Sequence, residues 1–345
     1  MAKARGKAKK TKSRAPLLIL LVIIAAVLGS IYYFFGPNSR KERFLYVRTG
    51  ETYDQLLTEL RDSNYINNAG SFDIIARQWK LAQHIRPGKY LISRGISSFE
   101  LVRKLRNGNQ VPVKIVINKL RTKNDFIELL SNNLEVDADR LHDMLSQPDY
   151  MEEFGLDTST VLCGVIPDTY EFYWSTSADK AFRKIFKNYS RFWSETRKRQ
   201  AKDHGLTPTQ ATIIASIIDE ETNKLDDKPN IASVYLNRLE KGMKLQADPT
   251  VKYAIGDFTI RRITGAMLKT QSPYNTYQNT GLPPGPICTP SASSVDAVLQ
   301  APKTNYIYFC AKADLSGASV FAATDAEHLK NAHAYQQALN ARGIH

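Results

Sequence analysis

An uninterrupted apolar run at residues 15–35 is the clearest hydrophobic pattern in the chain. Its 21 positions, APLLILLVIIAAVLGSIYYFF, carry no charge. As a helix they would extend roughly 31 Å, enough to cross the hydrocarbon core of a bilayer. The run ends in four aromatic residues, which gather at membrane–water interfaces. A cleaved signal peptide is the alternative, but its apolar region is normally shorter and precedes small residues at a cleavage site. The pattern therefore favours an uncleaved transmembrane helix.

After a short linker at residues 36–43, strand-like and helix-like patterns alternate up to residue 117. The predicted elements are, in chain order, a strand at 44–48, a helix capped by Thr52 with Gln55, a helix at 71–80, a strand at 89–93, a helix from Ser98 and a strand at 111–117. The alternation of short strands and amphipathic helices predicts a small α+β module at 44–117.

The pattern changes beyond this module and is mostly helical up to about residue 204. Apolar residues recur at steps of three and four along one predicted helix, namely at Phe182, Ile185, Phe186, Tyr189 and Trp193. Such a stripe is typical of a helix packed on a core. We therefore expect the aromatic side chains of this helix to be buried rather than to bind a ligand.

Residues 207–300 predict two helices followed by a long segment rich in Pro, Gly, Asn, Tyr and Thr. Loops of this length in a compact domain are usually functional or disordered, and the many aromatic residues argue against disorder. The tail predicts a strand at 305–309, a strand near Val320 and a helix capped by Thr324 with Glu327. We expect residues 118–345 to form one larger, mixed α+β domain, so that the whole chain is of the α+β class.

The positive charge of the chain is concentrated at its N-terminus. Of the net charge of +13, residues 1–14 supply seven Lys and Arg and no acid, which leaves about +6 for the rest. Nucleic-acid binding therefore loses most of its support. These seven charges outnumber Arg40, Lys41 and Arg43 on the other side of the apolar run. The positive-inside rule then predicts a cytoplasmic arm at 1–14, a single crossing of the plasma membrane and a folded body outside the cytoplasm.

Three cysteines, Cys163, Cys288 and Cys310, are too few and too scattered for a disulfide framework. One pair could form in an oxidising compartment, which would leave the third thiol free. The role that we expect for each is that of a small buried apolar residue.

The stretch ASIIDEETNK, residues 215–224, places three acids directly behind an apolar run. On a helix that begins at Thr207-Pro208, Glu221 continues the face of Ile214, Ile217 and Ile218, whereas Asp219 and Glu220 point away from it and can reach solvent. A carboxyl held against isoleucines would lose hydration, so its pKa would rise and it could act as a general acid. The alternative is that the helix ends here and Glu221 only emerges at the domain edge.

Other common catalytic chemistries have few candidates in the sequence. The six histidines are scattered, and no Cys/His pattern has metal-site spacing. There is no G-x-S-x-G motif and no glycine-rich phosphate loop. We therefore expect neither a metal ion nor another cofactor. Cleavage of glycosidic bonds is the typical task of carboxylic acids that work without them.

A second candidate cluster spans LQADPTVKYAIG, residues 245–256, and SPYNTYQNTGLPPGPICTP, residues 272–290. Asp248 precedes a proline, so it either caps a helix or belongs to a site. The tyrosines and amides of 272–290 could form a groove wall that binds sugars, or a loop held by its own packing. The sequence pattern leaves both alternatives open.

At this point the motifs resemble those of the MltG (YceG-like) family. The resemblance rests on ASIIDEET, NIASVYLNRLEKGMKLQADPTVKYAIG, SPYNTYQNTGLPPGPICTPS and the tail with NYIYF, and it covers nearly the whole chain. Members are membrane-anchored endolytic murein transglycosylases. The resemblance implies that Glu221 is the catalytic acid and that Gln246, Asp248 and Asn275 bind or position the substrate. It also implies that 44–117 is a LysM-like module that contacts glycan strands.

The resemblance further implies the reaction. Glu221 would protonate the oxygen that leaves when the β-1,4 bond between N-acetylmuramic acid and N-acetylglucosamine is cut, and then accept a proton from the muramic C6 hydroxyl, which gives a 1,6-anhydro end. Cleavage close to the membrane would limit the length of nascent strands, so a penicillin-binding synthase is an expected partner. The alternatives are a hydrolase that uses Glu221, Asp248 and water, and a non-catalytic anchor that only binds glycan.

The chain also departs from the family pattern at three places. Cys163 stands where the family often has Glu, Ser319-Val-Phe321 replaces an H-x-F in the tail, and Ser291 replaces a glycine after the long loop. None of them touches the ASIIDEET motif, so the implied reaction class is unchanged. They leave open the substrate preference and the role of the tail histidines.

Overall fold

The apolar run folds as helix α1, Ala15–Phe35, in a computed structural model that describes residues 14–342. Every side chain between Ala15 and Tyr33 is exposed, and the helix is long and apolar enough to cross a membrane. It is therefore compatible with a single-pass membrane anchor. The predicted basic arm at 1–14 lies, except for Arg14, outside the described residues.

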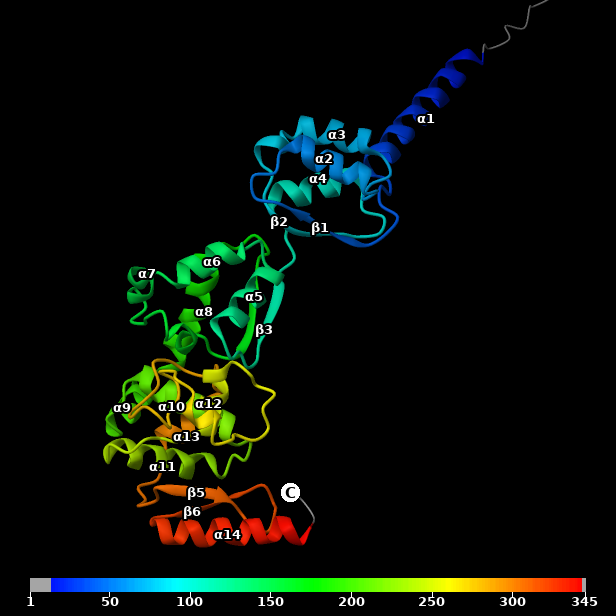
Figure 1. The fold of residues 1–345 in the computed structure, drawn as a ribbon. Coiled ribbons are helices and arrows are strands. Elements are labelled where there is room, and N and C mark those ends of the chain that lie inside the picture. Colours follow the sequence, from blue (N-terminus) through cyan, green and yellow to red (C-terminus); the bar gives the residue numbers. More distant parts are fainter. Residues whose placement is uncertain (1–13, 343–345) are drawn as a thin grey trace, which may run out of the picture. The chain divides into compact units, whose positions relative to one another are not determined.

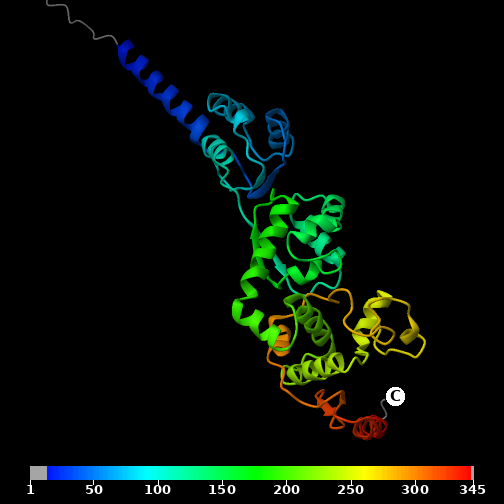
Figure 2. The ribbon, with the colours of Figure 1, turned by 90° about the vertical axis from the view of Figure 1, so that its left-hand side faces the viewer.

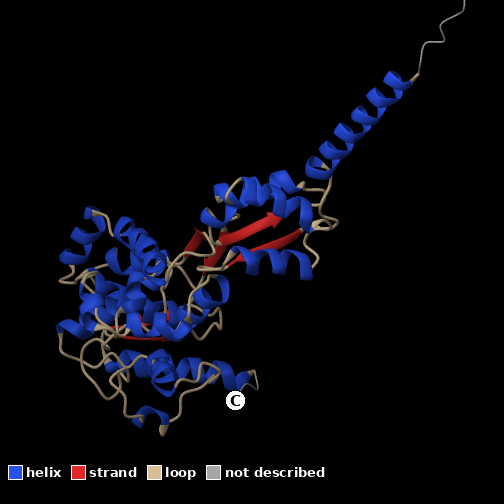
Figure 3. Cartoon of the chain, turned by 90° about the horizontal axis from the view of Figure 1, so that it is seen from above, coloured by secondary structure: helices blue, strands red, loops and turns tan. Residues whose placement is uncertain are grey.

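The described chain divides into two units. The first comprises the residues up to 112 together with 173–175, and the second comprises 113–172 and the residues from 176 onward. Short strands and many helices occur in both, and the described strands form three separate two-stranded sheets (Figure 3). The fold class is mixed α+β, as the sequence predicts.

The first unit packs three helices and a 3₁₀ turn on one antiparallel strand pair (Figure 1). Strand β1 pairs with β2 so that Phe44 lies opposite Leu91. Leu45 and Val47 alternate inward from β1 and are fully buried, as the period of two in a strand requires. The elements are β1 Arg43–Val47, α2 Tyr53–Asp62, α3 Ala69–Gln78, η1 Leu81–Gln83, β2 Gly88–Ile92 and α4 Ser98–Asn107.

The predicted helix starts in this unit are confirmed within one or two residues. Thr52 and Gln55 form the expected capping box of α2. The cap of α4 is Ser97, one residue before the predicted Ser98, and its hydroxyl accepts a hydrogen bond from the backbone N–H of Glu100. Local capping chemistry was therefore sufficient to place these helices.

The strand predicted at 111–117 forms, but in the other unit. It is β3, Val113–Ile117, and it pairs antiparallel with β4, Asp168–Phe172. The small module therefore ends at residue 112, and the predicted boundary after 117 differs from the division in the structure. Alternation along a strand reports its buried face but not its pairing partner, which here lies about 55 residues downstream.

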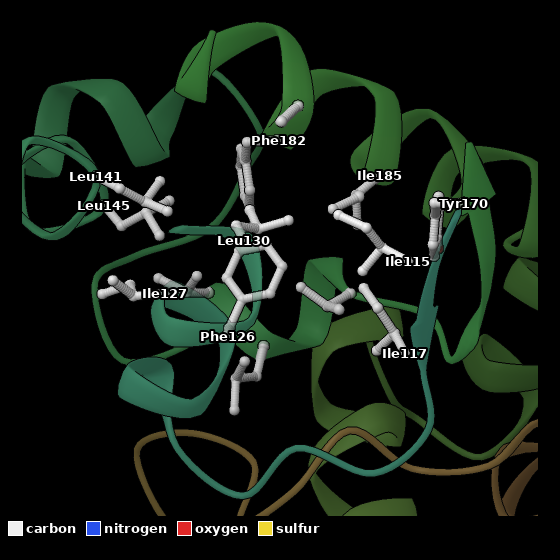
Figure 4. Packing of buried hydrophobic residues seen from close by; sticks show 14 of the residues in the cluster. Ile115, Ile117, Phe126, Ile127, Leu130, Leu141, Leu145, Tyr170, Phe182 and Ile185 are labelled. Atoms are coloured by element: carbon white, nitrogen blue, oxygen red, sulfur yellow. The ribbon is translucent and has the colours of Figure 1, made fainter. Parts of the chain in front are cut away.

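The second unit begins with a helical layer around this strand pair. Its helices are α5 Lys123–Asn133, α6 Ala138–Leu145, α7 Pro148–Glu152, η2 Val161–Gly164 and α8 Ala178–Phe192. Phe182 and Ile185 of α8 are fully buried and point toward Phe126 of α5 and Ile115 of β3 (Figure 4). The aromatic stripe of α8 is thus part of the core, as predicted.

A second helical layer of this unit surrounds α10, Pro208–Glu221. Every residue from Ala211 to Asp219 is buried, so α10 is enclosed on all sides rather than on one face. The elements around it and in the long loop are α9 Glu195–Asp203, α11 Lys228–Glu240, α12 Asp248–Ile255, η3 Met267–Lys269 and α13 Ala292–Leu299. A buried central helix gives the residue at its end a well-defined position.

The tail forms the hairpin and helix that the sequence predicts. Strand β5, Tyr308–Ala311, pairs antiparallel with β6, Ser319–Ala322, and α14, Asp325–Ala341, packs against both strands. Thr324 and Glu327 form the expected capping box. None of the three cysteines is in a disulfide: Cys163 and Cys288 are buried, whereas Cys310 is partly exposed.

Candidate active site

The three acids at the end of α10 have different surroundings. Helix α10 starts at a capping box formed by Thr207 and Gln210, with Pro208 in its first turn, and it ends at Glu221. Its apolar middle is held in the core, so the direction of each acid is set by its position on the helix. The predicted separation of Glu221 from its two neighbours is therefore present in the structure.

The prediction that Asp219 can reach solvent is wrong, because its side chain is only 7% exposed. Its Oδ1 atom lies 3.0 Å from Lys228 Nζ, and its Oδ2 atom lies 3.1 Å from Lys119 Nζ. Although burial opposes ionisation, hydrogen bonds donated by Ser291, Ser294 and Lys228 hold the pKa of this carboxyl well below its usual range. Asp219 therefore remains ionised and ties α10 to α11 and α13.

Glu220 is also engaged in ion pairs. Its carboxylate lies 2.9 Å from Lys119 Nζ and 3.2 Å from Arg121 Nη2. The side chain is 18% exposed, so the prediction that it can reach solvent holds only in part. The helical pattern predicted that Asp219 and Glu220 point away from the isoleucine face. It did not predict their ion pairs with Lys119 and Arg121, which lie far upstream in the sequence.

Glu221 has no cation within ion-pair distance among the described residues. Its one hydrogen bond through the side chain is donated by Tyr235 Oη, at 2.7 Å from Oε1. Burial raises the pKa of Glu221 to about 7, and the nearby carboxylate of Asp248 acts in the same direction. The Tyr235 hydrogen bond and Lys252 oppose this rise. At neutral pH a large fraction of Glu221 therefore carries a proton that it can donate.

A pocket of about 430 Å³ opens at Glu221. The residues that line it come from α10, α11, the loop before α12, the start of α12, the long loop and the tail: Glu221, Arg238, Leu245, Gln246, Asp248, Tyr277, Tyr308, Phe309, Asp325 and His328. Of the four residues predicted for the site, the structure places Glu221, Gln246 and Asp248 on this pocket. The fourth, Asn275, does not line it.

Asn275 organises the long loop instead of facing the pocket. Its side chain is fully buried, and its amide donates to the carbonyls of Leu268 and Thr270 at 3.0 and 2.8 Å. Its Oδ1 atom accepts from the backbone N–H of Tyr277 at 3.0 Å. In this structure Asn275 is thus buried within the long loop and orders it.

The residue that Asn275 positions reaches Asp248. Tyr277 Oη donates to Asp248 Oδ1 at 2.7 Å. Asp248 is the first residue of α12, and its side chain makes no helix-capping hydrogen bond there. Asp248 therefore lines the pocket and does not cap α12.

Arg238 is a pocket residue that the sequence analysis missed. Its Nη1 atom donates to Leu245 O at 2.7 Å and to Gln246 Oε1 at 3.2 Å, and its Nε atom donates to Ile307 O at 2.7 Å. The guanidinium also lies 5.4 Å from the centre of the Tyr308 ring. Arg238 therefore holds the Gln246 loop and the tail strand together. The sequence offered one signal for Arg238, namely its spacing of three residues from Tyr235, which places both side chains on one face of α11.

The tail contributes a second group of missed residues. His328 of α14 stacks on Tyr308 of β5 with ring centres 5.0 Å apart and planes 15° apart. Its Nδ1 atom is buried and has no hydrogen-bond partner within residues 14–342. No local signal singled out this histidine, because its place in the pocket depends on how the tail packs on α11.

The three departures from the family pattern all lie away from this pocket. Cys163 is fully buried in the first core of the second unit. Ser291 caps α13 and its hydroxyl also donates to Asp219 Oδ1 at 2.6 Å. Ser319 is held through its backbone N–H, which donates to Asp227 Oδ2 at 2.7 Å. These substitutions thus have structural roles, and the pocket is built from other residues.

Comparison with known proteins decides the family. The sequence model of the YceG-like family matches residues 45–334, which is most of the chain. The chain belongs to the YceG-like family.

Two endolytic murein transglycosylases are similar to this YceG-like chain over most of its length. It is 29% identical over 311 residues to an endolytic murein transglycosylase of Bacillus subtilis (strain 168), a match that covers 85% of each protein. It is 24% identical over 358 residues to an endolytic murein transglycosylase of Streptococcus pneumoniae serotype 2 (strain D39). That match covers 91% of this chain but 64% of the longer relative.

A solved structure has the same fold. The crystal structure of a YceG-like protein from Listeria monocytogenes is 28% identical, with a TM-score of 0.54, and the match covers 85% of this chain and 99% of that one. Among residues 14–342, no group of three or more His, Cys, Asp or Glu side chains is placed so that it could hold a metal ion.

Proposed function

We propose that this chain is an endolytic murein transglycosylase that cuts the β-1,4 bond between N-acetylmuramic acid and N-acetylglucosamine within peptidoglycan strands. The observation that carries the proposal is the Glu221 carboxyl, which lies on a pocket, is partly desolvated and has a pKa of about 7. The substrate class follows from the names of the relatives in Bacillus and Streptococcus.

In this proposal Glu221 acts twice. As a neutral acid it donates its proton to the glycosidic oxygen, and the bond from that oxygen to the muramic C1 breaks. The resulting carboxylate then accepts the proton of the muramic C6 hydroxyl, whose oxygen forms the new bond to C1. The product carries a 1,6-anhydro end, no water is consumed and Glu221 returns to its protonated state.

The neighbouring residues assist these steps by holding charges and shape. Tyr235 donates to Oε1 of Glu221 and so fixes the orientation of the carboxyl. Asp248, held by Tyr277, stabilises the protonated form of Glu221 through its negative charge. Gln246, held by Arg238, presents an exposed polar side chain to the pocket that can hydrogen-bond sugar hydroxyls.

The proposal also includes the placement of the enzyme. Helix α1 would cross the plasma membrane once, with the basic arm in the cytoplasm and both folded units outside it. The first unit would act as a LysM-like module that contacts glycan strands. A penicillin-binding synthase that extends those strands would be the protein partner, and nucleic acid would not be a ligand.

A second candidate function is a hydrolase that uses Glu221, Asp248 and a water molecule. It is favoured by one observation, namely that the two carboxylates line the same pocket and interact electrostatically. Two carboxylates with room for a water between them are the usual arrangement of inverting glycosidases.

Product analysis separates these functions. Purified murein is digested with the full-length protein and with Glu221→Gln, and the muropeptides are identified by mass spectrometry. We expect 1,6-anhydro-muramic ends with the wild type and none with the variant. Reducing ends would replace our proposal with the hydrolase. Equal products from the two proteins would exclude a catalytic role of Glu221, and no cleavage products from either protein would support a non-catalytic anchor.

A further inference from the structure

A second pocket, in the first unit, has a chemistry different from that of the Glu221 site. It has a volume of about 300 Å³ and is lined by Ser93, Arg94, Gly95, Ile96, Glu100, Arg103, Lys104 and Asn109. Three cations thus face one carboxylate. Arg94 and Arg103 are exposed, and neither forms an ion pair within the part of the chain that the structure describes. The pocket therefore offers two arginines to an anion.

This pocket lies close to the end of the predicted membrane helix. Phe35, the last residue of α1, packs on Phe99 of α4 with ring centres 4.9 Å apart. The Arg103 guanidinium, one turn further along α4, lies 5.9 Å from the centre of the same Phe99 ring. On the other side of the pocket, the Gly95 N–H donates to the carbonyl of Ser39 at 2.9 Å, four residues after α1. Figure 2 shows the end of α1 beside α4.

The junction between α1 and the first unit is well packed. Phe34 contacts the core of the unit, and Tyr33 Oη donates to Asn68 Oδ1 at 3.5 Å. Just beyond the helix, Asn38 is buried and its amide donates to Ser98 Oγ at 2.7 Å. Because α1 continues directly into the packed unit, the pocket is held next to the surface of any bilayer that α1 crosses.

The charge distribution along the chain supports an anionic partner at this place. Residues 36–112 contain 13 Lys and Arg against 7 Asp and Glu, a net charge of +6. Residues 113–345 contain 27 of each kind and are neutral overall. All the excess positive charge beyond the N-terminal arm and α1 is therefore found in the unit that adjoins the membrane helix. This excess does not extend to the unit that carries Glu221.

We propose that the pocket of Arg94 and Arg103 binds the phosphate of an anionic phospholipid headgroup, with phosphatidylglycerol as the probe lipid. Arginine is suited to phosphate because its planar guanidinium can donate two parallel hydrogen bonds. The headgroup layer of a bilayer is on the order of 5–8 Å thick on each side, and Arg103 is reached from Phe35 through two contacts of 4.9 and 5.9 Å over Phe99. Binding would seat the first unit on the membrane surface. The proposal rests on α1 spanning a membrane, but not on the chemistry of Glu221.

The test uses the full-length protein in nanodiscs of phosphatidylcholine alone or with one third phosphatidylglycerol. Hydrogen–deuterium exchange is followed in peptides that cover residues 93–109. We expect these amides to exchange at least about threefold more slowly in the anionic discs, because a bound headgroup suppresses local opening. The difference should shrink when the salt concentration rises from about 0.05 to about 0.5 M, since salt screens the attraction.

Two double variants with the same loss of charge separate a site from general attraction. Arg94→Gln with Arg103→Gln should abolish the lipid-dependent protection. Arg61→Gln with Arg77→Gln should keep it, because these arginines belong to the same unit but pair with Asp62 and Asp73 outside the pocket. Amides of the strands β1 and β2 report whether each variant is still folded.

Three results would overturn the proposal. Equal exchange in the two kinds of nanodisc would mean that the pocket does not bind the anionic lipid. Loss of protection in both double variants would point to net charge alone. Protection by soluble glycerol phosphate in phosphatidylcholine discs, equal to that by the lipid, would identify a site for soluble phosphate. No murein is present in any of these measurements, so their outcome is independent of the proposed cleavage.

Discussion

Asp219 and Glu221 lie two residues apart at the end of the same buried helix, yet the pKa values of their carboxyl groups are shifted in opposite directions. The pKa of Asp219 is held well below its usual range, whereas that of Glu221 is raised to about 7. Desolvation acts on both and by itself favours the neutral acid. Asp219 overcomes it with two lysines and two serine hydroxyls, whereas Glu221 receives one hydrogen bond from Tyr235. The number of donors and cations, rather than burial alone, decides which acid keeps its proton.

The two environments correspond to two tasks. The Asp219 network joins the end of α10 to the starts of α11 and α13, so it holds the framework that carries the pocket. The Glu221 carboxyl faces that pocket with few partners, which leaves its proton available. The four predictions below alter one side of this pair at a time.

The largest effect is expected for Glu221→Gln. The substitution removes the transferable proton and little volume, so cleavage of murein should fall by about 10²–10⁴-fold while the fold is retained. The measurement is the rate at which anhydro-muropeptides are released. The matched control is Glu220→Gln next to it, which should keep most of the activity. If both variants lose cleavage equally, the assignment of the proton donor to Glu221 is wrong.

Asp219→Ala tests the structural side of the comparison. It leaves Lys228 as a buried cation without its carboxylate partner, and we expect a loss in the free energy of unfolding of about 3–5 kcal/mol. Denaturant unfolding of the second unit, followed by the fluorescence of the buried Trp193, measures this loss. Adding Lys228→Met should restore part of the stability, because no unpaired charge then remains. Stability unchanged in Asp219→Ala would contradict a structural role of the ion pair.

The pH dependence of stability should differ between wild type and Glu221→Gln. The folded-state pKa of about 7 lies above the ordinary value of 4.5. The folded protein therefore binds more protons in this interval, so the contribution of Glu221 to stability is present below pH 4.5 and is lost as the pH rises through about 7. Above that pH the variant should be more stable than the wild type, by on the order of 1–3 kcal/mol. A difference that does not vary between pH 4.5 and 8 would show that the pKa of Glu221 is not raised.

The smallest effect is expected on the pH profile of cleavage. Activity should decline as the pH rises through about 7, because Glu221 loses the proton that it donates. Asp248→Asn removes a charge that raises this pKa and should move the decline to lower pH by roughly half a unit to one unit. Tyr235→Phe removes a hydrogen bond to the carboxylate and should move it to higher pH. The midpoint of the profile is the readout, so a lower overall rate does not affect the result. Midpoints that move in the same direction in both variants would contradict these assignments.

Local sequence patterns were enough to predict many of the helices and strands and to single out Glu221. The capping boxes at Thr52 and Thr324 depend on residues three apart, and the length of α1 depends on an unbroken apolar run. The alignment of Glu221 with Ile217 and Ile218 follows from helix geometry alone. The resemblance to the YceG-like family added Gln246 and Asn275, and it implied a site role for Asp248, which the sequence pattern alone had left open.

The remaining features depend on which segments meet, and this was decided by the tertiary structure. Strand β3 pairs with β4 rather than with the small module, and Asp219 is neutralised by Lys119 instead of reaching solvent. Arg238 and His328 enter the pocket through the packing of the tail on α11. The sequence by itself therefore determined the helix faces, the caps and the position of Glu221 in line with the isoleucines of α10, because these depend on neighbours within a few residues. Only the folded chain decided the burial and the partners that separate the pKa of Glu221 from that of Asp219, because the groups responsible come from distant segments.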